Sequence, residues 1–376
     1  GTGFAGDINL DTKDKLEISN ESLILSDGFY GRIFLNSSNS SINIKDSFLT
    51  AKDDNNNISD INKFSLIKIT ASQGSIGIDN SYITTENTGI GFAGDINLNA
   101  KEKIKILDTP ISTRGNLGRI LIGKSDLSNE TLSPQEVVFN NSFLTVSNDS
   151  VERSKASETE INAGNISIDA VNSIFFIRDS RISTVTERRG NAGNLTVQSK
   201  NGVVSFDNSD IFSNVNAGGI GGAGDITITA GSIFLTNGTQ LQSGVKQTFD
   251  DFIQSEILGT GGNITLNAGK NITLSGSSLN NKPSGIFTDV ESNAIGIAGN
   301  IIITTNSLFL TDQAILTSRS SGLGYAGNIT VNANSINLDN NSKIEALNTP
   351  PAGISITLSS GNIDLQISDN LILRDS

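Results

Sequence analysis

The stretch AGNITVNANSINLDNNSKIEAL, residues 326–347, alternates polar and apolar side chains three times over. The alternations are centred on residues 328–332, 335–339 and 342–346, and Asn, Asp, Ala and Ser separate them. Period-two alternation over a few residues, interrupted by turn-forming residues, is typical of short half-buried strands. One such stretch therefore predicts three strands joined by very short turns.

The beginning of this stretch recurs along the whole chain. A small residue, Gly, Asp or Asn, and an aliphatic residue follow one another repeatedly, and in the second half these anchors fall every 28 to 38 residues. Self-similarity at such a period marks a stacked repeat, in which each unit buries its apolar face only against its neighbours. The residue after the anchor glycine is Asp7, Asp95, Asn165, Asn194, Asp225, Asn263, Asn300, Asn328 or Asn362.

Three strands per coil, coil upon coil, predict an all-β fold, a parallel β-helix of about twelve coils. Apolar spacing of three and four is nowhere sustained, so helices are not expected. Stacked parallel strands lie about 4.8 Å apart, which predicts a rod about 55–60 Å long. We expect residues 1–376 to form one continuous β-helix, with insertions near 52–63, 147–160 and 246–258. Because the last residues, 370–376, read as a second strand without a third, we expect a fragment of a longer array.

The nine Asp and Asn residues after the anchors are expected to form a structural ladder if the coils stack in register. Asn can both donate and accept hydrogen bonds along such a column, whereas stacked carboxylates would repel. From Asn165 onward the only Asp, Asp225, has Asn on either side. The alternative is that Asn and Asp are simply common turn residues. The anchor glycine is expected to supply a positive φ or a tight corner.

The amino-acid composition limits the classes of partner and ligand that the chain can bind. The chain has 376 residues and a net charge of −13, with 39 acidic and 26 basic residues, which argues against nucleic acid or an anionic membrane as a partner. Cys, His, Trp and Met are absent, which excludes disulfides and thiolate or imidazole metal sites. No run approaches the roughly 18 apolar residues of a membrane span. We therefore predict no cofactor, no metal site and no membrane span.

Parallel β-helices also host enzymes that act on polysaccharides, so catalysis has to be weighed. Glycoside hydrolysis needs converging carboxylates, and the adjacent pairs that stand out, Asp53-Asp54 and Asp250-Asp251, lie in predicted insertions and not on rigid coil faces. No lyase-type base beside a carboxylate cluster recurs. The segment Gly218–Asp225 resembles a calcium-binding roll, but one isolated copy cannot build a site that needs consecutive turns. We predict no catalytic residues and no enzyme activity.

The residues carry a resemblance to a known family. The phrases AGNISI (163–168), GSIFLT (231–236) and DQAILTS (312–318) resemble the repeat region of filamentous-haemagglutinin-like exoproteins of the two-partner secretion type, above all the large cyanobacterial representatives. The resemblance implies a right-handed β-helix, export through a dedicated outer-membrane transporter, and an extracellular or cell-surface location. The family's secretion domain usually carries an Asn-Pro-Asn-Gly type motif, and this chain has no Asn-Pro pair.

The resemblance also implies a function. We expect a secreted or cell-surface structural rod that acts in adhesion, in contact with a surface glycan or a protein ligand. An outer face rich in Ser, Thr and Asn could hydrogen-bond sugars, although three Tyr and scattered Phe indicate no aromatic stacking platform. The alternatives are an inert spacer that projects another domain and a carbohydrate-active β-helix enzyme.

Overall fold

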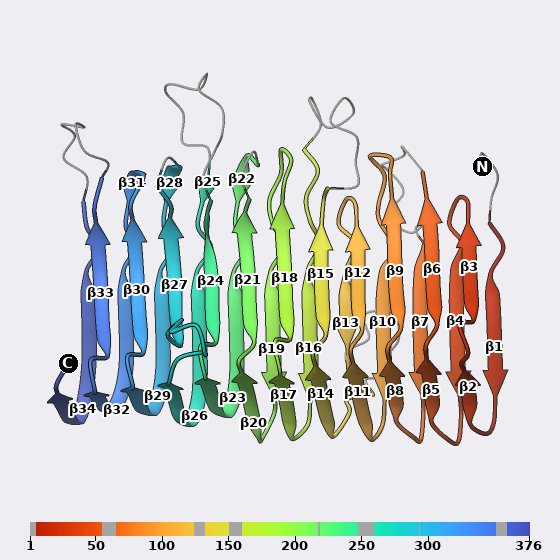
Figure 1. Cartoon of the computed structure of the whole chain (residues 1–376), viewed down its shortest axis with the longest axis horizontal. Coiled ribbons are helices and arrows are strands. Elements are labelled where there is room, and N and C mark those ends of the chain that lie inside the picture. The colour runs from red at the N-terminus through yellow and green to blue at the C-terminus, as the bar shows by residue number, and fades with distance from the viewer. Residues whose placement is uncertain are drawn as a thin grey trace.

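The computed structural model describes residues 5–54, 65–123, 132–149, 160–216, 219–246, 259–292, 294–350 and 359–376. Within these ranges the chain is built of strands and turns and contains no helix, and every pairing between the labelled strands is parallel. Figure 1 shows the coils side by side along one long axis, with the two ends of the chain at opposite ends of the rod. The predicted insertions fall largely outside the described residues, since 55–63, 150–159 and 247–258 belong to the undescribed part.

The strands of the coils form three faces of parallel strands, which we call sheets 1, 2 and 3 in the order in which the chain enters them. Each coil begins with a strand of sheet 1 and continues, after a short turn, into a strand of sheet 2. In the first seven coils the sheet 1 strands are β1 (Ile8–Thr12), β4 (Arg32–Ser37), β7 (Leu66–Ala71), β10 (Asp95–Ala100), β13 (Ile120–Ile122), β16 (Ile166–Ala170) and β19 (Leu195–Ser199). The sheet 2 strands of these coils are β2 (Leu16–Ile18), β5 (Ile42–Lys45), β8 (Ile76–Asp79), β11 (Lys103–Leu107), β14 (Glu136–Asn140), β17 (Ser173–Ile177) and β20 (Val203–Asp207).

In the later coils one continuous strand serves both sheets, which are thereby joined. These strands are β23 (Ile226–Thr236), β26 (Ile264–Ser275), β29 (Ile301–Thr311), β32 (Ile329–Asp339) and β34 (Ile363–Arg374). Sheet 3 closes the coil on the remaining side. Its strands are β3 (Leu23–Asp27), β6 (Phe48–Asp53), β9 (Tyr82–Asn87), β12 (Pro110–Arg114), β15 (Phe143–Ser147), β18 (Arg181–Thr186), β21 (Asp210–Val215), β24 (Gln240–Val245), β27 (Gly285–Val290), β30 (Ile315–Ser320) and β33 (Lys343–Asn348).

The coils wind in a right-handed sense. In Figure 1 the strands of sheet 3 run upward on the near side, sheet 1 runs down behind them, and the chain advances from right to left. The predicted right-handed parallel β-helix is therefore confirmed. The register gives twelve coil levels in the described residues, marked by one inward aliphatic position of sheet 1: Ile8, Ile33, Ile67, Ile96, Ile120, Ile166, Leu195, Ile226, Ile264, Ile301, Ile329 and Ile363.

Some coils have a fourth short strand that the repeat pattern did not predict. It lies between sheets 3 and 1 and comprises β22 (Gly221–Gly222), β25 (Gly259–Thr260), β28 (Ile295–Ile297) and β31 (Leu323–Tyr325). Strands of two or three residues are too short to show alternation, so the sequence carries no signal for them. A small apolar cluster lines this corner and includes Val215, Val245 and Val290.

The core is a set of parallel columns, because each inward side chain lies on its counterpart one coil away. One core cluster runs through the described coils from Ile18 to Leu338. In one sheet 2 column the aliphatic residues give way to three phenylalanines, Phe139, Phe176 and Phe206. Their rings stack nearly parallel, with centroids 4.5 and 4.4 Å apart. The spacing of the coils thus imposes a continuous ring stack inside the rod.

From the second coil with an anchor onward, the anchor glycines are required by close approach and not by an unusual φ, which corrects one of the two roles expected for them. At Gly6, in the first coil, a Cβ would meet nothing within 4 Å. None of the anchors in the described residues has a positive φ. A Cβ at Gly193 would instead overlap the carbonyl oxygen of Gly164 in the coil before it, and Gly224, Gly299 and Gly361 face the same obstacle. The backbones of successive coils come so close at this corner that a side chain has no room.

Candidate functional site

All nine Asp and Asn residues of the predicted ladder lie in one column at the entry to sheet 1. The register of sheet 1 places Asp7, Asp95, Asn165, Asn194, Asp225, Asn263, Asn300, Asn328 and Asn362 at the same position of their coils. Three levels carry other residues, Arg32, Leu66 and Arg119. From Asn165 onward the column is unbroken.

The bonding in this column differs from an amide ladder. Each side-chain oxygen accepts a hydrogen bond from the backbone N–H of the column residue one coil later, at 2.7–3.0 Å from Asn165 through Asn362. Side-chain amides join neighbours at only two steps of the described column, from Asn263 to Asp225 and from Asn300 to Asn263. A carboxylate oxygen accepts a hydrogen bond from a backbone N–H just as an amide oxygen does. This explains why Asp225 can occupy a position in a column of asparagines.

The two isolated aspartates are neutralised by arginines in the next coil. The Arg32 guanidinium donates to both carboxylate oxygens of Asp7, at 3.0 and 2.7 Å. Arg119 does the same to the nearly buried Asp95, and the Arg119 backbone N–H also donates to Asp95 Oδ1 at 3.0 Å. Hydrogen bonding to Asp7 raises the pKa of Arg32 above its ordinary value. In this part of the column, ion pairs between Asp and Arg therefore occur where the later coils have neighbouring Asn and Asp residues.

Asn300 allows the bonding pattern to be tested. Asn300→Ala leaves the Asn328 N–H without its acceptor at 2.8 Å and should lower the free energy of unfolding by about 1 kcal/mol. Asn300→Asp keeps that oxygen and loses only the amide donated to Asn263, so we expect a smaller loss. Thermal unfolding followed by circular dichroism ranks the two variants. An aspartate variant as unstable as the alanine variant would contradict an acceptor role.

A second column lies at the turn between sheets 2 and 3, where an Asp or Asn precedes a Ser or Thr. The acidic or amide residue has a positive φ, 44° to 61°, at Asp46, Asn80, Asp108, Asn141, Asp179 and Asn208. The following hydroxyls are buried, and the backbone N–H of Ser47 donates to the Ser81 hydroxyl one coil later at 3.2 Å. The Ser81 N–H donates likewise to Thr109. These turns are rigid because the hydroxyls hold successive coils together.

The exposed side chains of these turns alternate strictly between Asp and Asn over six coils. Each Asn donates its amide to the Asp one coil earlier: Asn80 to Asp46 at 2.7 Å, Asn141 to Asp108 at 2.8 Å and Asn208 to Asp179 at 2.7 Å. Alternation keeps carboxylates from lying directly against each other. We call the column of Asp46, Asn80, Asp108, Asn141, Asp179 and Asn208 the ridge. It was not predicted, although the recurring Asp-Ser, Asn-Ser and Asp-Thr dipeptides were a signal that could have revealed it.

Beside the ridge runs a hollow, which we call the aromatic groove. It has a volume of about 840 Å³, and the turn residues Asn20, Glu21, Asp46, Asn80 and Asp108 line one side of it. The other side is the first outward position of sheet 3, where Phe48, Tyr82 and Pro110 lie on consecutive coils and Phe143 follows. The side chain of Phe48 is 48% exposed, so the groove presents this ring to solvent. Phe143 lies one coil beyond the residues that line the groove and is 39% exposed.

The alternation of polar and apolar residues did not predict this column of ring-bearing side chains. Phe48 and Tyr82 are paired across strands β6 and β9, and Pro110 and Phe143 are paired across β12 and β15. Tens of residues separate these positions along the chain. Only the stacking of coils of unequal length brings them into line.

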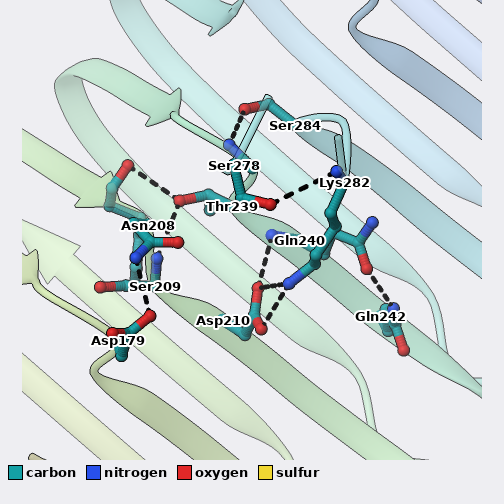
Figure 2. A network of polar contacts seen from close by, with 12 residues as sticks. Asp179, Asn208, Ser209, Asp210, Thr239, Gln240, Gln242, Ser278, Lys282 and Ser284 are labelled. Carbon is teal, nitrogen blue, oxygen red and sulfur yellow. Dashed lines mark hydrogen bonds and ion pairs between the residues drawn. The ribbon is translucent and has the colours of Figure 1, made fainter. Parts of the chain in front are cut away.

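Further along the rod the same corner becomes charged. A second hollow of about 410 Å³, the charged hollow, is lined by residues that include Asp179, Arg181, Asn208, Asp210 and Lys282. Lys282 comes from the loop 276–284, which folds back across the turn and brings its Nζ within 2.7 and 2.6 Å of the Asp210 carboxylate oxygens (Figure 2). Gln240 fastens the same loop by donating to the Pro283 carbonyl oxygen. The loop thus closes this end of the corner.

One carboxyl outside these hollows has a strongly shifted pKa. Asp289 of sheet 3 is largely buried, and desolvation raises its pKa to about 6 although Arg319 lies 3.4 Å away. Its Oδ1 has no hydrogen-bond partner in the structure. Because the pKa is raised, the carboxyl favours folding when protonated, and that contribution is lost as the pH rises through about 6.

Of the acidic residues weighed for catalysis, the structure describes Asp53 and Asp54, which lie at the end of strand β6 and directly after it. Asp53 ends strand β6, is buried, and accepts a hydrogen bond from the Tyr30 N–H. Asp250 and Asp251 lie outside the described residues. In the ranges that the structure does describe, no group of three acidic residues is placed to hold a metal ion. Gly221 and Gly222, from the segment compared with a calcium-binding roll, form the short strand β22.

Comparison with known proteins adds no relative to this picture. No protein-family model, no curated protein and no solved structure matches the chain. The fold therefore rests on the strands and their register, and the resemblance to filamentous-haemagglutinin-like repeats rests on the repeat phrases alone. The aromatic groove and the charged hollow are the surface features from which a function can be argued.

Proposed function

We propose that the chain is part of a secreted or cell-surface rod that acts in adhesion, making cell–cell, surface or matrix contacts. The observation that carries the proposal is the aromatic groove, an open hollow in which the rings of Phe48 and Tyr82 lie beside polar turn residues. Exposed aromatic side chains beside hydrogen-bonding groups are typical of binding surfaces. The repeat phrases that resemble two-partner exoproteins support export through an outer-membrane transporter of that type.

The architecture supports a role in which reach and rigidity matter. Inward columns of aliphatic residues fill the axis, and two hydrogen-bonded columns tie each coil to the next. A stack of this kind holds a surface feature at a fixed place along a stiff rod, since each coil is fixed by both neighbours. Among the described residues there is no helix, and so none that could cross a membrane.

The proposal is a binding protein and not an enzyme. Hydrolysis of a glycoside requires two carboxyl groups at a defined separation on opposite sides of the scissile bond. In the aromatic groove the acids Asp46 and Asp108 belong to one ridge, on the same side, and each accepts an amide from an Asn of the next coil. This arrangement favours holding a ligand over cleaving it.

Adhesion can be tested with the intact chain. Beads coated with residues 1–376 are expected to remain on cell layers or matrix-coated surfaces under shear that removes beads coated with albumin. Retention of the rod-coated beads no greater than that of the albumin beads on every surface would favour the inert spacer. Release of reducing ends or unsaturated uronides from polysaccharides would favour the enzyme. Deleting residues 147–160 or 246–258 tests whether the predicted insertions make the contact.

A further inference from the structure

We propose that the aromatic groove binds a polysaccharide free of acidic groups, with the sugar chain lying parallel to the rod axis. The inference rests on the proposed adhesive function and names the class of ligand. It is carried by two features that lie side by side, the row of rings and the row of carboxylates. Both run along the rod axis: the ring-bearing residues recur at every coil, and Asp46 and Asp108 recur at every second coil with Asn80 between them.

The ring-bearing residues beside the groove form a row that runs along the rod axis. Phe48, Tyr82, Pro110 and Phe143 occupy one outward position on consecutive coils, at the parallel-strand spacing of about 4.8 Å. That spacing is close to the length of one pyranose unit in an extended chain. The face of an aromatic ring carries negative charge density and attracts the polarised C–H groups on the flat side of a sugar. Phe48 and Tyr82 supply two adjacent faces of this kind, and the saturated ring of Pro110 continues the apolar surface on the next coil. An extended surface of this kind suits a polymer of sugars better than a single sugar.

The ridge provides carboxylates that can accept hydrogen bonds from a ligand. Asp108 is exposed and Asp46 is half-buried, and each is held by the amide of the next coil's Asn and not by a cation. Their remaining lone pairs are strong acceptors for sugar hydroxyls. Glu21 adds a third carboxylate to the same lining. Carboxylates repel acidic sugars, so the lining selects against uronic acids and sulfated chains.

The groove also has a defined end. After Phe143 the outward position becomes Arg181 and then Asp210, whose carboxylate is taken up by Lys282. Arg181 lies over the Phe212 ring at 5.2 Å, so its guanidinium is already engaged. The residues of this row that line the groove, from Phe48 to Pro110, cover two coil steps, about 10 Å, and Phe143 extends the row by one more step. This length accommodates a short run of sugar units.

The test uses soluble (1→4)-linked hexasaccharides of glucose and of N-acetylglucosamine, with a hexamer of galacturonate as the acidic probe. Titration calorimetry with residues 1–376 is expected to show one binding site for at least one neutral hexamer and none for the acidic one. Phe48→Ala with Tyr82→Ala should weaken that binding at least tenfold. Phe309→Ala is the matched control, because this ring is similarly exposed, at 37%, on a different face.

Several results would overturn the proposal. These are no binding of either neutral hexamer at millimolar concentration, equal binding of the galacturonate hexamer, or no effect of removing Phe48 and Tyr82. Asp46→Asn with Asp108→Asn keeps the shape of the ridge and should reduce the discrimination against the acidic hexamer. If discrimination stays unchanged, the carboxylates do not select the ligand.

The failure of this inference can be told apart from the failure of adhesion. If rod-coated beads adhere and the Phe48, Tyr82 variant adheres equally well, adhesion stands and the groove is not its site. If the beads do not adhere although a neutral hexamer binds in the groove, the groove inference stands and the adhesive function does not. Circular dichroism of each variant confirms that the coils are intact.

Discussion

Gly193→Ala is expected to destabilise the rod strongly, by about 3 kcal/mol, at the upper end of the cost of overpacking. The new Cβ would overlap the Gly164 carbonyl group and the Asn165 nitrogen, which are backbone atoms of the coil before it. Neither backbone can retreat easily, because the Gly193 carbonyl oxygen accepts hydrogen bonds from the Thr184 and Ser213 hydroxyls at 2.5 and 3.1 Å. The two coils would have to separate, which breaks contacts on both sides.

The measurement is the midpoint of thermal unfolding, together with amide hydrogen exchange of strands β16, β19 and β23. Exchange is needed because a stacked repeat can open locally without unfolding as a whole. Gly269→Ala is the control: a Cβ there meets nothing within 4 Å, and its φ is not positive. We expect that variant to be as stable as the parent. Unchanged protection around Gly193→Ala would show that the coils are not closely apposed at the anchors.

Phe176→Ala should have an effect of similar or greater size. Phe176 lies buried between the rings of Phe139 and Phe206, so truncation opens a cavity in the axis and removes both ring contacts. Truncating a buried phenylalanine costs roughly 3–5 kcal/mol. The loss should appear in the thermal midpoint and as faster exchange of β14, β17 and β20.

Phe176→Leu tests the same position with less damage. Leu235, Leu274, Leu310 and Leu338 occupy the equivalent column position in later coils, so the backbone accommodates leucine there. We expect a loss of about 1 kcal/mol, as for swaps of nearly conserved volume. Phe309→Ala, on the outer face, should change stability by less than about 0.5 kcal/mol. A Phe176→Ala protein as stable as the parent would mean that the ring stack contributes no net stability.

The repeat pattern allowed the strand class, the parallel pairing and the number of coils to be predicted. Alternation at 328–332 and 335–339 determines which side chains face inward, because the side-chain period of a strand is two residues. The recurring anchor determines the register, since one aliphatic position repeats in every coil. The joining of two predicted strands into β32 (Ile329–Asp339) was not foreseen, because Ala333 and Asn334 were interpreted as a turn, whereas the backbone stays extended through them.

The bonding of the columns could be predicted only in part. The column of Asp and Asn residues was visible in the sequence. The donor of its hydrogen bonds, the backbone N–H of the next coil, was not visible, because every residue except proline carries the same N–H group. The reason for the anchor glycine was also hidden. A required positive φ and a required close approach both select glycine, and only the position of the Gly164 oxygen relative to Gly193 distinguishes them.

The sequence by itself determined a stacked all-β repeat and its inward and outward faces, because alternation and repetition are local properties of the chain. Apart from the column of Asp and Asn residues that the repeat predicted, the tertiary structure decided which outward residues meet. Phe48, Tyr82, Pro110 and Phe143 become a row only when coils of unequal length are laid on one another, and Lys282 reaches Asp210 only because a loop folds back across two coils. Surface neighbours in a β-helix are set by register between coils, which no local pattern of outward residues encodes.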